Sequence, residues 1–191
     1  MRTEDIIDFR KFIDELSKET DRGLPLVSMA LIDEKLRDTL ESFFIEGEVT
    51  KKLLDEFNSP LGSLSSRLTT CYALGLIDDY EYSEINILRK VRNEFAHLKH
   101  GINFSTEKIK GLCSSLKSQL PEGEDYPLNN PRFRFRNAVI CIVLRLIYRP
   151  EWVLKEKRLN KNWSQGNDKW IPFKEQQPPE GMPIIAMAKK D

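Results

Sequence analysis

Residues 78–101 read DDYEYSEINILRKVRNEFAHLKHG, and this stretch decides the fold predicted for the chain. Glu81 follows Asp78 by three residues, which is the spacing of a capping box, so a helix is expected to begin directly after Asp78. Gly101 is expected to end it. Four apolar residues recur at helical spacing on the side expected to face a core: Leu88, Val91, Phe95 and Leu98.

The rest of the chain repeats this pattern of amphipathic segments separated by Gly and Pro. Ser59-Pro60 and Asn130-Pro131 each place an N-cap residue before a proline suited to the first helical position. Gly75 is expected to close one helix as its C-cap. We therefore predict an all-α fold, a compact bundle of six to seven helices over residues 6–16, 26–44, 49–57, 60–74, 79–99, 106–120 and 131–148.

The last forty residues have a different composition. Prolines interrupt them repeatedly, and they contain all three tryptophans of the chain, Trp152, Trp163 and Trp170. We expect a helical domain over residues 1–150 and an irregular arm over residues 151–191, with short strands near 163–173 and 184–188. Because exposed tryptophan is costly, the arm is expected to pack on the body or on a partner.

Overall composition excludes several classes of protein. The 191 residues hold 30 basic and 30 acidic side chains, so the net charge of 0 excludes a histone-like binder of nucleic acid. The longest apolar run, residues 138–144, is too short for a membrane helix, and residues 1–5 lack the core of a signal peptide. A cytoplasmic location and no membrane contact are expected. The three cysteines are far apart and predict neither a disulfide framework nor a zinc–thiolate site.

Charge is unevenly distributed along the chain. Residues 1–58 have a net charge of −6, and residues 129–161 have a net charge of +7. Two interpretations fit this asymmetry: the two segments attract each other, within one chain or between two chains, or the basic segment faces an anionic ligand.

The helix over residues 79–99 also has a polar side. Arg89, Asn93, Ala96 and His97 share it, and Arg92 lies at its border. Asn93 and His97 are four residues apart and are expected to be neighbours. The small Ala96 would let a backbone or a phosphate approach closely.

The six residues from Arg92 to His97 resemble the motif of the HEPN superfamily of all-helical proteins. This resemblance implies a metal-independent endoribonuclease, of toxin or defence type, or a binding protein that has lost activity. In active members two protomers pair, so a homodimer is expected. Arg92, Asn93 and His97 are the catalytic candidates: histidine can act as base or acid, arginine can bind a phosphate, and Asn93 can orient the imidazole or hold the phosphate.

A longer stretch resembles a narrower family. Residues 60–67, the turn Leu74-Gly75-Leu76-Ile77, and Leu88-Arg89 at matching separations are similar to the mannitol-operon repressor family, over roughly residues 25–150. This resemblance implies a regulator of transcription. Because the chain shows no convincing helix-turn-helix and no net positive charge, regulation is expected to work through a partner.

A second candidate for nucleic-acid contact is residues 132–136, where arginines alternate with phenylalanines. Arg132, Arg134 and Arg136, with Arg89, are the predicted nucleic-acid-binding residues. The alternative is a solvated basic helix start that meets the acidic N-terminal segment. We expect no metal or cofactor, since His97 and His100 lack a convincing third ligand.

Two functional hypotheses follow. The favoured one is a regulatory protein of the mannitol-repressor type that contacts a protein or nucleic acid. The other is a HEPN-type ribonuclease that uses Arg92 and His97.

Overall fold

The computed structural model describes residues 3–97, 101–121 and 126–161, with side chains from residue 9 onward. Its described residues contain helices and turns and no strand, which confirms the all-α prediction. Seven helices have seven residues or more: α1 (Thr3–Lys18), α2 (Gly23–Phe43), α3 (Glu48–Leu54), α4 (Leu64–Ala73), α5 (Asp79–His97), α6 (Glu107–Ser114) and α7 (Pro131–Leu146). A short α8 (Arg149–Val153) and a 3-10 turn, η1 (Leu154–Glu156), follow them.

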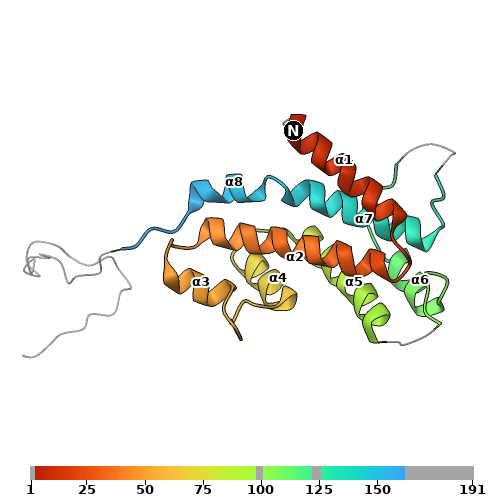
Figure 1. Cartoon of the computed structure of the whole chain (residues 1–191), viewed down its shortest axis with the longest axis horizontal. Coiled ribbons are helices and arrows are strands. Elements are labelled where there is room, and N and C mark those ends of the chain that lie inside the picture. The colour runs from red at the N-terminus through yellow and green to blue at the C-terminus, as the bar shows by residue number, and fades with distance from the viewer. Residues whose placement is uncertain (1–2, 98–100, 122–125, 162–191) are drawn as a thin grey trace, which may run out of the picture. The chain divides into compact units, whose positions relative to one another are not determined.

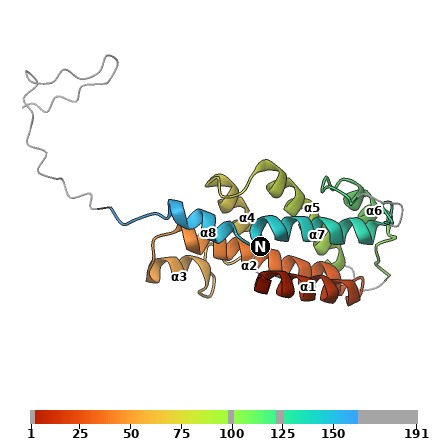
Figure 2. The ribbon, with the colours of Figure 1, turned by 90° about the horizontal axis from the view of Figure 1, so that it is seen from above.

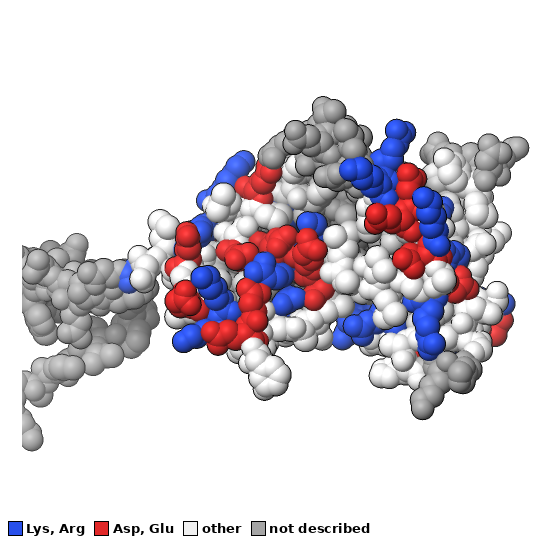
Figure 3. All heavy atoms as spheres, in the orientation of Figure 1, with Lys and Arg blue, Asp and Glu red and all other residues white. Residues whose placement is uncertain are grey.

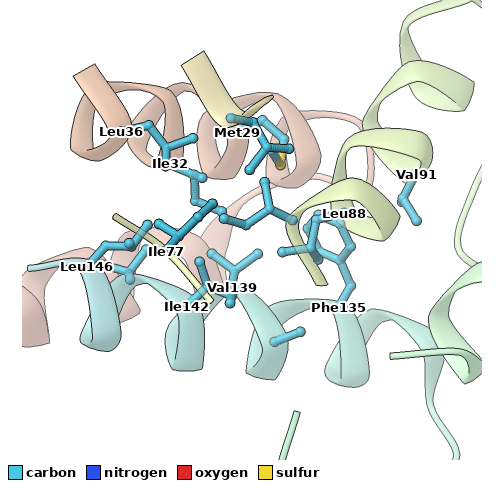
Figure 4. Close-up of a cluster of buried hydrophobic side chains, with 14 of the residues drawn as sticks. Met29, Ile32, Leu36, Ile77, Leu88, Val91, Phe135, Val139, Ile142 and Leu146 are labelled. Atoms are coloured by element: carbon cyan, nitrogen blue, oxygen red, sulfur yellow. The ribbon is translucent and has the colours of Figure 1, made fainter. Parts of the chain in front are cut away.

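Helix α2 is the central element of the bundle. It contacts α4, α5, α7 and α8. In Figure 1 it lies between α7–α8 on one side and α3–α5 on the other, and Figure 2 shows α7 and α8 overlying it. Its side chains Met29, Ile32 and Leu36 meet residues of α5 and α7 in one continuous core (Figure 4). The long apolar pattern of α2 therefore reflects burial against several partners.

The core face predicted for α5 is confirmed where it is described. Leu88, Val91 and Phe95 are fully buried, and Leu98 lies outside the described residues. The capping box is also present, because the Glu81 backbone N–H donates to Asp78 Oδ1 and the Asp78 N–H donates to Glu81 Oε2.

The predicted start of the fourth helix was wrong by several residues. The N-cap of α4 is Ser63, whose hydroxyl accepts the Ser66 N–H at 3.1 Å, and not Ser59. Residues 59–62 instead form a turn in which the Gly62 N–H donates to the Ser59 carbonyl. The buried Arg67 holds this turn by donating to the Leu61 carbonyl at 2.7 Å.

The sixth helix ends at Ser114 and not near Leu120. The expected last turn is not helical, because side chains from α5 and α7 form hydrogen bonds with its backbone N–H and carbonyl groups. The Glu84 carboxylate accepts the N–H groups of Lys117 and Ser118, and Arg134 donates to the carbonyls of Cys113 and Leu116.

Helical structure continues past residue 150. Pro150 lies in the first turn of α8, where its missing N–H costs nothing. The first compact unit of the chain reaches Leu159, and Trp152 on α8 is 71% exposed. The predicted arm from residue 162 onward, with Trp163, Trp170 and both predicted strands, lies outside the described residues.

Candidate functional site

The polar face of α5 brings together part of the predicted site. Arg92 is partly buried and donates from Nη1 to the Asn93 side-chain oxygen at 3.0 Å. His97 is exposed and is the last residue of the helix. Asn93 thus contacts the guanidinium, and the described residues show no hydrogen bond to the His97 ring. The arrangement leaves the imidazole accessible and the arginine oriented.

A further arginine lies at the same end of α5. Arg22, which directly precedes α2, donates from Nε and Nη2 to the Phe95 carbonyl, both at 3.2 Å. This contact places positive charge at the C-terminus of a helix, where the dipole favours it. Arg22 was not predicted from the sequence, because only the tertiary fold brings it to the Phe95 carbonyl near the end of α5.

Arg89 links two helices. Its Nη1 donates to Ser65 Oγ next to the start of α4, and its Nη2 donates to Asn86 Oδ1, both at 3.1 Å. Its Nε is buried without a hydrogen-bond partner among the described residues. Arg89 is therefore held against α4.

The arginines of residues 132–136 are also engaged within the protein. Arg132 forms an ion pair with Asp21 at 2.9 Å and donates to the Glu19 carbonyl. Arg134 donates to three carbonyls at the C-terminal end of α6 and just beyond it, those of Cys113, Ser114 and Leu116. Arg136 donates to Ser17 Oγ at 3.0 Å. The contacts of Arg132 and Arg136 favour the alternative in which the basic segment meets the acidic N-terminal segment.

The burial of two carboxylates, those of Glu81 and Glu84, was not predicted from the sequence. Glu81 has no exposed surface, and its Oε1 accepts from Arg145 at 2.9 Å and from Arg149 at 2.5 Å. Glu84, also buried, accepts the Ser118 hydroxyl as well as the two N–H groups described above. Both glutamates lie on the core face of α5, at helical spacing from Leu88. That spacing was the available signal for their burial.

The charged network around Glu81 joins the start of α5 to the end of α7 and the start of α8. Asp78 pairs with Arg145 at 2.5 Å, and the Arg145 guanidinium lies over the Tyr80 ring. Burial raises the pKa of the Tyr80 phenol, whose oxygen contacts Ser118. Arg149 also donates to the Leu76 carbonyl at 2.8 Å, so α8 is tied to the turn before α5. This cluster has a structural role.

Metal-ligating groups do not gather in the described part of the chain. No three of its His, Cys, Asp or Glu side chains are placed to hold a metal ion, and His100 lies outside it. All three cysteines are free, and burial raises the pKa of the Cys71 and Cys113 thiols to about 12. No helix within residues 3–97, 101–121 and 126–161 is long and apolar enough to cross a bilayer.

Comparison with known proteins identifies the family. The family model described as "Mannitol repressor" matches residues 4–130. No curated protein sequence matches significantly. Among solved structures, a chain of the X-ray structure of the MtlR-HPr complex from Escherichia coli is similar, with 25% sequence identity and a TM-score of 0.50 over 76% of this chain and 98% of that chain. The chain belongs to the mannitol repressor family.

Proposed function

We propose that this chain is a transcriptional regulator that acts by binding a protein partner, and that its partner is an HPr-type protein. The observation that supports this most is the similarity to a chain crystallised in a complex with HPr, since it extends over 98% of that chain. A cytoplasmic location is part of this proposal, because a regulator of transcription works where the genes are.

The arrangement of charge supports a protein partner over direct binding to DNA. Arg132 and Arg134, predicted as phosphate contacts, use their guanidinium groups on Asp21 and on backbone carbonyls. The whole chain has no net positive charge to attract DNA.

Size-exclusion chromatography with light scattering tests this proposal. The full chain is mixed with HPr from its own source organism, and Escherichia coli HPr serves as a comparison. We expect a peak whose mass is the sum of the two proteins. Separate elution of both proteins at all concentrations would contradict the proposal.

A second proposal concerns the HEPN-like face of α5. The exposed His97 and the Asn93-bound Arg92 have the side chains that metal-independent RNA cleavage uses. Such cleavage would need a homodimer to supply the paired site. The expected activity is conversion of RNA to 2′,3′-cyclic phosphate ends, lost in His97→Ala and kept in the control Glu94→Ala. An inactive wild-type protein, or a strictly monomeric one, would contradict it.

A further inference from the structure

The loop after α3 exposes a large aromatic side chain. Phe57 is 95% exposed, and Val49 on α3 is 73% exposed. Asn58 follows with a φ of 59°, a left-handed conformation that is uncommon for residues other than glycine. An exposed phenylalanine gains nothing from the hydrophobic effect in the isolated chain, and it would gain from burial against a partner.

The loop that carries Phe57 is firmly held. Arg67 is only 8% exposed, and it donates to the Leu54 carbonyl at 2.9 Å and to the Leu61 carbonyl at 2.7 Å. The Leu61 N–H donates to the Leu53 carbonyl at 2.9 Å. Both ends of the loop are thus fixed to one buried side chain. A loop backbone held in this way loses little freedom when the loop binds a partner.

The surroundings of Phe57 are acidic and concave. Residues 33–58 hold eight acidic and four basic side chains, and the red side chains gather over α2 and α3 in Figure 3. An open pocket of about 530 Å³ lies beside the loop, with Glu56, Asn58 and Arg67 in its lining. Asp55 is paired with Arg37 at 2.6 Å. The Glu56 carboxylate, in contrast, pairs with none of the described side chains.

We propose that Phe57 and the acidic surface around it form a docking surface for a protein partner that presents an apolar helix face bordered by Lys or Arg. The negative charge disfavours nucleic acid and anionic membranes, and it attracts a cationic surface. The exposed aromatic residue would be the anchor of the interface, as aromatic side chains often are. This surface is separate from the polar face of α5, and it does not depend on HPr.

A pair of synthetic peptides can test this surface on the full chain. The probe is an amphipathic helix of leucine and lysine, and the matched peptide has glutamate in place of lysine. Isothermal titration is expected to show binding of the lysine peptide alone. Phe57→Ala should weaken that binding about tenfold or more, and Glu56→Lys should also weaken it. Circular dichroism should show both variants folded, since neither side chain is buried.

Trp152→Ala is the matched control. Trp152 is an exposed aromatic residue on α8, on the other side of α2 from α3 (Figures 1 and 2). Its removal should leave binding of the lysine peptide unchanged. The proposal is overturned if Phe57→Ala binds like the wild type, if Trp152→Ala weakens binding equally, or if the lysine peptide does not bind the wild type.

Discussion

Truncation of Glu81 should destabilise the protein strongly. Glu81 is fully buried and accepts from Arg145 and Arg149 as well as from the Asp78 N–H. Removing one partner of a buried ion pair costs about 3–5 kcal/mol. Arg145 and Arg149 retain 44% and 23% exposure and can regain water. We therefore expect the lower end of the range, about 3 kcal/mol, for Glu81→Ala.

Urea and thermal unfolding would measure this change. For a chain of this size, a loss of about 3 kcal/mol corresponds to a fall in Tm of about 6–12 °C. The dependence on urea concentration should keep its slope, because the surface exposed on unfolding is unchanged. In a double-mutant cycle, Arg149→Ala should add much less in the Glu81→Ala background than in the wild type.

Glu94→Ala is the control on the same helix. Glu94 pairs at 2.7 Å with Lys108, whose side chain is 68% exposed, so its loss should cost about 1 kcal/mol or less. The reasoning is refuted if Glu81→Ala costs no more than Glu94→Ala, or if the effects of Glu81→Ala and Arg149→Ala simply add.

Three further predictions concern single positions. Arg134→Ala should lower stability by about 2 kcal/mol in urea unfolding, because it removes the donor to three carbonyls at the C-terminal end of α6 and just beyond it; an unchanged midpoint would contradict its structural role. Gly75→Ala should cost about 1–2 kcal/mol by the same measurement, because Gly75 has a φ of 71°. Burial raises the pKa of the Cys71 thiol to about 12. The protonated thiol therefore makes its full contribution to the free energy of unfolding at any pH below the ordinary thiol pKa. This contribution should fall by about 1.4 kcal/mol per pH unit as pH rises toward 12, and a wild-type pH profile matching that of Cys71→Ala would contradict this.

Features of the fold that depend on local signals could be predicted from the sequence. The Asp78–Glu81 capping box and the Asn130 cap of α7 are where the sequence indicates them. Gly75 has the left-handed conformation expected of a residue that follows a helix.

Boundaries set by distant side chains could not be predicted. The start of α4 depends on Arg67 holding the Leu61 carbonyl, and the end of α6 depends on Glu84 and Arg134. Nothing in the local sequence near Leu120 shows that a buried carboxylate will take the N–H of Ser118.

In the candidate site, too, the sequence indicates positions set by helical spacing but not contacts made by distant side chains. The position of His97 on the polar side of α5 follows from helical spacing, and the structure leaves His97 exposed. Arg89 contacts Ser65 and Arg132 pairs with Asp21, and both of these partners are far away in the sequence. Charge pattern alone indicated that the acidic and basic segments could meet, but it could not select the pairs.

Isothermal titration of the full chain with HPr tests the central claim most directly, with MtlR from Escherichia coli as the positive control. The account predicts saturable binding with one HPr per chain. An absence of binding heat at several temperatures, under conditions in which the control binds, would contradict the account.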